Sequence, residues 1–175
     1  GFRHITNNIR PIERPEDLKN LKIRTPNSRI RIQTFQSFGA AATPMSWPEV
    51  FSALQQGVVD GQENPLPQIY TVRQVQKYLS KTGHIYAIHT VLMNLNRFNK
   101  LSVDDQQIVL KAAKQASVDH MRESEKADEE LITKLIEEGM KVNEADIGAF
   151  VEASRAIWAD YPEWADMIRE ISEVK

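Results

Sequence analysis

Helix-breaking residues are distributed unevenly along this chain, and their distribution divides it into two parts. Seven of the 8 prolines lie between Pro11 and Pro67, and the remaining one is Pro162. Proline ends helices and is excluded from central strands, so the first part can contain only short elements. Between Ser102 and Glu138 the sequence contains neither proline nor glycine. One long helix is therefore expected over this stretch.

The first ninety residues alternate strand patterns with capped helix patterns. We expect a short helix opening at Pro15, strands at 21–24, 42–45, 58–65 and 85–95, and helices at 28–38, 46–57 and 68–79. Ser46 and Glu49 have the spacing of a capping box at the start of the third helix. Strands and helices that alternate in this way are typical of an α/β fold with a parallel or mixed sheet flanked by helices.

The second part is helical apart from one short strand candidate. Ser102 and Asp105 form a capping-box pattern at the start of the long helix, and Gly139 follows its end. The middle of this helix lacks the apolar stripe found at both ends, so we expect the middle to cross solvent. A strand is expected at 140–142, followed by a helix capped by Asn143 and by a last helix that starts at Pro162.

Composition excludes several classes of protein. The chain has 175 residues, of which 41% are hydrophobic, and a net charge of -2, as in soluble globular proteins rather than disordered ones. It has no apolar run of about 18 residues that would span a bilayer. It has no cysteine, which excludes disulfides, thiolate metal sites and cysteine nucleophiles.

The small net charge hides an asymmetry between the two parts. Residues 1–100 carry 13 Lys and Arg against 6 Asp and Glu, a balance of +7, whereas residues 101–175 carry 9 against 18, a balance of -9. A basic half usually faces an anionic partner. Its basic residues are dispersed and lack interleaved aromatic residues, so nucleic acid is not the expected partner.

Familiar catalytic and cofactor motifs are missing from the sequence. It contains no Gly-rich phosphate loop, no nucleophile elbow and no H-E-x-x-H helix. Its four histidines include no pair spaced by four residues, and acidic runs such as 128–130 match a solvated helix face. We therefore expect no metal site, no cofactor and no catalytic residue.

Polar residues follow the ends of the early strands, the edge at which open α/β sheets bind small ligands. Arg24 ends a strand shortly before Asn27, and its planar fork fits a carboxylate, although it could equally be a surface arginine. Asn64 could donate to the same carboxylate or cap the next helix. Trp47 could form the floor of a pocket or cover the core.

At these residues the sequence resembles the solute-binding proteins of TRAP (tripartite ATP-independent periplasmic) transporters, DctP type. Five groups of residues carry the resemblance in the order of that family, densely over 1–96. They are Gly1–Asn7, Pro15–Ser28, Thr43–Val50, Ala53–Gly57 and Val59–Pro65, with Val75–Leu79 after them.

The resemblance implies a site for an organic acid. In that family the arginine in the position of Arg24 grips the ligand carboxylate, helped by the asparagine in the position of Asn64. A further arginine stands where Arg3 is, and the aromatic residue in the position of Trp47 packs on the ligand. We also place Asn27, from the same motif as Arg24, among the ligand-binding residues.

Glu63 and His84 match a polar pair that lies behind the binding arginine in that family. We expect them to orient Arg24 without touching the ligand.

The resemblance also implies a two-domain, periplasmic-binding-protein-like architecture of the type II style. We expect residues 1–88 to form the ligand-binding second domain. Residues 89–140 would provide a crossover strand and long connecting helix of the first domain, and residues 141–175 would pack back across both. Family members are longer, so the N-terminal part of the first domain is expected to be absent. The surface left bare would then favour self-association.

The leading hypothesis is a periplasmic binding protein that delivers a C4-dicarboxylate or sugar acid to TRAP membrane subunits, closing by hinge bending, and not an enzyme. Two alternatives remain open at this point: a lyase or isomerase acting on small acids in the same cleft, and a helical interaction module. The sequence does not identify the acid, the oligomeric state or a signal peptide.

Overall fold

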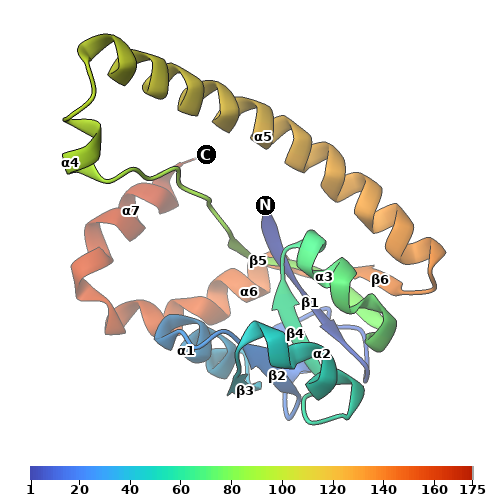
Figure 1. Ribbon diagram of the computed structural model, residues 1–175. Helices are drawn as coiled ribbons and strands as arrows, with labels where there is room; N and C mark the ends of the chain where they lie inside the picture. Colours follow the sequence, from blue (N-terminus) through green and yellow to red (C-terminus); the bar gives the residue numbers. More distant parts are fainter. Residues whose placement is uncertain (175) are drawn as a thin grey trace.

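A computed structural model, which describes residues 1–174, contains one six-stranded mixed sheet (Figure 1). Its strands are β1 (Phe2–Asn7), β2 (Lys22–Thr25), β3 (Ala41–Pro44), β4 (Gly61–Asn64), β5 (Tyr78–Tyr86) and β6 (Lys141–Glu144). They lie in the order β3-β2-β4-β1-β5-β6, in which β1 runs antiparallel to both neighbours and the other pairs are parallel. The expected mixed α/β fold is therefore confirmed.

Helices connect the strands and extend beyond the sheet. They are α1 (Arg29–Ser37), α2 (Trp47–Gln55), α3 (Leu66–Val72), α4 (Leu95–Phe98), α5 (Val103–Glu137), α6 (Ile147–Ser154) and α7 (Ala165–Glu173). Short 3-10 turns lie at Pro15–Leu18, Arg73–Val75, Arg155–Asp160 and Pro162–Trp164. Among residues 1–174, no helix is both long enough and apolar enough to cross a membrane.

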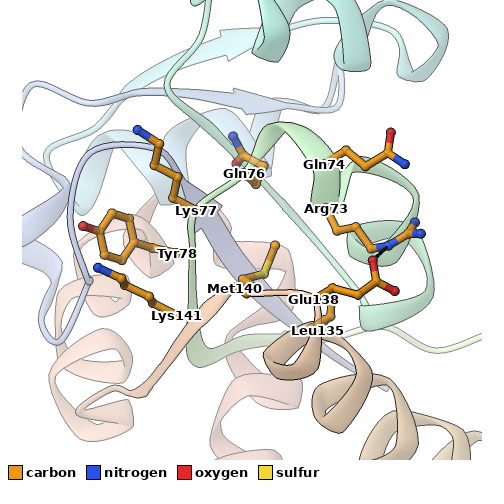
Figure 2. A pocket seen from close by; sticks show the side chains of 10 residues that line it. Arg73, Gln74, Gln76, Lys77, Tyr78, Leu135, Glu138, Met140 and Lys141 are labelled. Carbon is orange, nitrogen blue, oxygen red and sulfur yellow. Dashed lines mark hydrogen bonds and ion pairs between the residues drawn. The ribbon is translucent and has the colours of Figure 1, made fainter.

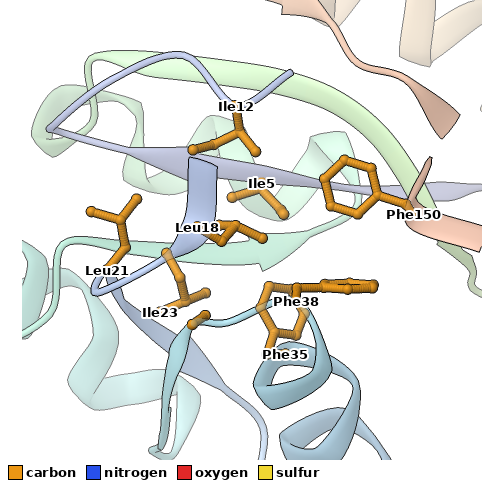
Figure 3. Close-up of a cluster of buried hydrophobic side chains, with 9 residues drawn as sticks. Ile5, Ile12, Leu18, Leu21, Ile23, Phe35, Phe38 and Phe150 are labelled. Carbon is orange, nitrogen blue, oxygen red and sulfur yellow. The ribbon is translucent and has the colours of Figure 1, made fainter. Parts of the chain in front are cut away.

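The main core lies between the sheet and α1 (Figure 3). Ile5 of β1 and Ile23 of β2 point toward Phe35 of α1 and Phe38 just after that helix, and all four are buried. Phe150 of α6 packs edge-on against Phe38, with 5.0 Å between ring centroids. The C-terminal segment is thus anchored in the core of the first ninety residues.

The long helix α5 forms as its end signals predict. The Asp105 N–H donates to the Ser102 hydroxyl at 3.1 Å, and Gly139 takes a left-handed φ of 94° just beyond the last turn. At 1.5 Å per residue its 35 residues span about 50 Å. Only Leu135, near the C-terminal end, is buried, and Figure 1 shows the helix crossing above the sheet.

Two expectations about the middle of the chain are wrong. The helix expected over 68–79 ends at Val72, and a strand, β5, begins at Tyr78. The strand expected over 85–95 ends at Tyr86, and residues 87–94 have no regular structure. Strand pairing explains both differences, because β5 hydrogen-bonds to β1 on one side and to β6 on the other. Local sequence patterns do not show which strands will pair.

Two predicted caps also differ from the structure. Asn143 lies in β6, where its side chain donates to the Ile12 carbonyl at 3.0 Å, and Asp146 caps α6 instead. The Ser46 hydroxyl donates to the Glu49 carboxylate at 2.6 Å, so the two side chains bond each other rather than backbone N–H groups.

The expected division into segments stays a prediction. The structure shows that β6 and Phe150, from the expected third segment, belong to the sheet and core of the first one. Lys175, the last residue of that third segment, lies outside the described residues.

Candidate functional site

A cavity of about 640 Å³ opens at the ends of β2 and β4. Its lining includes Arg24, Asn64, Trp47 and Arg3, four of the five residues predicted to bind ligand. Asn27 is not in the lining, although its neighbour Pro26 is. The structure therefore brings most of the predicted residues into one pocket of a size usual for small-molecule sites.

Arg24 forms no ion pair with a carboxylate among residues 1–174. It is only 4% exposed, and its Nε and Nη2 both donate to the Met45 carbonyl, at 2.9 and 2.6 Å. Its Cζ lies 5.5 Å from the centroid of the Trp47 ring. Burial lowers the pKa of Arg24; the charge of Glu63 opposes this effect, and the charges of Arg3 and Arg31 add to it.

Arg3 is held differently, in a buried network with β4. Its Nε pairs with Glu63 Oε2 at 2.5 Å, and its Nη2 donates to Glu63 Oε1 at 2.9 Å and to Asn64 Oδ1 at 2.8 Å. Asn64 Nδ2 in turn donates to Gln62 Oε1 at 2.5 Å. These bonds fix the orientation of the Asn64 amide at the cavity wall.

Glu63 lies at the centre of that network and is completely buried. It also accepts from Arg31 Nη1 at 3.1 Å and lies 3.4 Å from His84 Nε2. Burial raises the pKa of Glu63, but hydrogen bonds from His84 and Arg3 outweigh that effect and lower it to about 2. Burial lowers the pKa of His84.

The expectation that Glu63 and His84 orient Arg24 is wrong. Arg24 lies opposite Gln62 in the β2–β4 pairing, and residues paired in this way point to the same face of a sheet. Glu63, the next residue, points to the other face, where α1 brings Arg31. Glu63 therefore orients Arg3 and Arg31, and the Met45 carbonyl orients Arg24.

Several lining residues escaped the sequence analysis. Arg31 lies in the first turn of α1, the helix that follows β2, and that position was a usable signal. His89, His120, Ser124 and Asp128 line the opposite side, where the rings of His89 and His120 stack with centroids 6.2 Å apart. His120, Ser124 and Asp128 are spaced by four residues, which was visible in the sequence. Within residues 1–174, no group of three or more His, Asp or Glu is arranged to hold a metal.

A smaller cavity of about 290 Å³ lies between the C-terminal end of α5 and the start of β5 (Figure 2). Its one arginine, Arg73, forms an ion pair with Glu138, which also accepts from the Tyr70 hydroxyl at 2.8 Å. Lys77 and Lys141 extend away from this pair in Figure 2. None of the predicted site residues lies here, so the larger cavity is the candidate site.

Comparisons with known proteins show the family to which the chain is similar. A sequence model described as bacterial extracellular solute-binding protein, family 7 (DctP) matches residues 1–163. A solute-binding protein of Verminephrobacter eiseniae is 42% identical, over 92% of this chain and 49% of that protein. The sialic acid-binding periplasmic protein SiaP of Vibrio cholerae is 37% identical, over 92% and 50%.

A solved structure extends the similarity to the fold. A TRAP periplasmic solute-binding protein from Polaromonas sp. JS666, bound to D-erythronate, superposes with a TM-score of 0.90 at 38% identity. The match covers 100% of this chain and 59% of that one. The fold is thus that of a periplasmic solute-binding protein, as predicted, and the chain spans about half the length of the curated relatives it matches.

Proposed function

Because the chain belongs to the bacterial extracellular solute-binding protein family 7, we propose that it binds an organic acid through its carboxylate and serves a TRAP transporter. It would work outside the cytoplasm, in the periplasm, and hand the acid to the membrane subunits. One observation carries the proposal: Arg24 is buried, lines the cavity and is the arginine there that lacks an ionic partner among residues 1–174.

The physical argument starts from the cost of leaving Arg24 unpaired. A buried guanidinium loses hydration, and the Met45 carbonyl, which is neutral, occupies only two of its five N–H groups. A carboxylate can accept from the remaining N–H groups in the bidentate geometry that arginine favours. The Asn64 amide has one N–H left after bonding Gln62, and the Trp47 ring flanks the same space.

Arg3 supports this site from behind. Its Nη2 already donates to Glu63 Oε1, to the Glu63 carbonyl and to Asn64 Oδ1. We therefore assign Arg3 to holding Asn64 in position rather than to binding the ligand by itself. Glu63, which lies 3.4 Å from His84 Nε2, holds Arg3 in place. A binder needs such fixed donors and no nucleophile, and the proposed role is therefore transport and not catalysis.

We propose that the cleft closes when the organic acid binds and opens again to release it. The irregular segment 87–94 and the helix α5 connect the sheet to more distant parts of the molecule, so they are the elements in which a hinge would bend (Figure 1). Apolar side chains of this region, including Leu92 and Leu95, are exposed. We propose that they pack against the rest of a longer protein or a second copy.

The test is a calorimetric titration of Arg24→Ala and wild type with a panel of organic acids. Loss of two charge-assisted hydrogen bonds weakens binding about 100-fold or more. The matched control is Arg122→Ala, which removes an exposed arginine of α5 and leaves affinity unchanged. Equal affinity of wild type and Arg24→Ala for every acid refutes the proposal, and chemical conversion of a bound acid would instead indicate an enzyme.

A further inference from the structure

The cavity that contains Arg24 has a second wall, which the proposed carboxylate site does not use. His120, Ser124 and Asp128 of α5 all line it, and their spacing by four residues places them on one face of the helix. His89, from the segment after β5, stacks on His120 with 11° between the ring planes. We call these four residues the α5 wall.

The α5 wall carries unused hydrogen-bonding capacity. Within residues 1–174, none of its four side chains takes part in a hydrogen bond or an ion pair, whereas Asp119 and Glu130 on other faces of α5 do. Burial raises the pKa of Asp128, and the positive charge at Gly1 opposes part of that effect. Carboxylate, hydroxyl and imidazole groups together can both donate to and accept from hydroxyl groups.

The two sides of the cavity differ in charge. Arg3, Arg24 and Arg31 lie on one side, and Glu63 neutralises only part of their charge. Asp128 is the acidic residue of the lining, and it lies on α5, beside Gly1. A ligand long enough to reach both sides therefore places its carboxylate at the arginines and its far end against an anion.

We propose that the α5 wall forms hydrogen bonds with the hydroxyl groups of the bound acid and makes this chain selective for a polyhydroxylated monocarboxylate. The inference rests on the proposed function. Hydroxyl groups at the far end donate to Asp128 and exchange hydrogen bonds with Ser124 and His120. A second carboxylate in that position faces a like charge and loses its hydration without gaining a donor. A dicarboxylate of equal length is thus disfavoured.

The experiment compares three six-carbon acids by isothermal titration calorimetry: an aldonate, an unsubstituted monocarboxylate and a straight-chain dicarboxylate. Wild type binds the aldonate at least about tenfold more tightly than the other two. Asp128→Asn weakens aldonate binding about tenfold and strengthens dicarboxylate binding several-fold, because it removes a strong acceptor together with the repulsion. Glu129→Gln, a change of the same kind at the adjacent exposed residue, leaves all three affinities unchanged.

Ser124→Ala separates hydroxyl recognition from charge. It weakens aldonate binding several-fold and leaves dicarboxylate binding unchanged, because it removes a hydroxyl without altering charge. A preference ratio that stays within twofold of wild type in Asp128→Asn, or a wild type that prefers the dicarboxylate, overturns the inference. Binding that depends on Arg24 but not on Asp128 refutes this inference alone. Binding of no acid refutes the proposed function and this inference with it.

Discussion

Replacing Glu63 by Gln tests whether this carboxylate holds the arginine network together. Glu63 is buried between Arg3 and Arg31, and its pKa falls from 4.5 to about 2 in the folded protein. A shift of this size corresponds to about 3 kcal/mol of stability at pH 7. Glu63→Gln leaves two cations near one neutral amide, so we expect it to lower the free energy of unfolding by about 3 kcal/mol or more.

The same shift predicts how the effect depends on pH. Because the pKa of Glu63 is lower in the folded state, its contribution is present above pH 4.5 and is lost as pH falls toward 2. At pH 3 only about 1 kcal/mol of it remains. The difference in unfolding free energy between wild type and Glu63→Gln therefore shrinks by about 2 kcal/mol from pH 7 to pH 3.

Urea denaturation at both pH values, followed by circular dichroism, measures this difference. The matched control is Glu144→Gln, which removes the ion pair between Glu144 and Lys81. Because the Glu144 side chain is 76% exposed, this change lowers the unfolding free energy by less than about 1 kcal/mol. Two results refute the reasoning: a Glu63→Gln protein within about 0.5 kcal/mol of wild type at pH 7, or a difference that is the same at pH 3.

Two further predictions concern the fold. Ser102→Ala removes the hydroxyl that caps α5 and lowers the unfolding free energy by about 1 kcal/mol in the same assay; an unchanged midpoint would show that the cap contributes nothing. Gly61→Ala places a Cβ inside contact distance of the Thr6 carbonyl oxygen, where β1 meets β4, and costs more than about 3 kcal/mol, visible as a large drop in melting temperature. A melting temperature equal to that of wild type would exclude such a close approach of these two strands.

The sequence predicted the candidate site better than it predicted the contacts within it. Strand ends and the family resemblance pointed to Arg24, Asn64, Trp47 and Arg3, and all four line one cavity. The partner of Glu63 was misassigned, because the sequence does not show which strands are neighbours or which residues lie opposite each other.

The opposite wall was missed for a related reason. His120, Ser124 and Asp128 are spaced as one face of a helix, but their spacing does not say what that face meets. Only the path of α5 across the molecule brings them to the cavity (Figure 1).

Local signals in the sequence determined where most elements begin and end. Ser102 marks the start of α5 and Gly139 marks its end, because capping and left-handed backbone conformation depend on a few adjacent residues. The tertiary structure decided the strand order, the start of β5 at Tyr78 and the pairing of Arg3 with Glu63 across sixty residues. Those features depend on contacts through space between distant segments, and such contacts exist only once the sheet has formed.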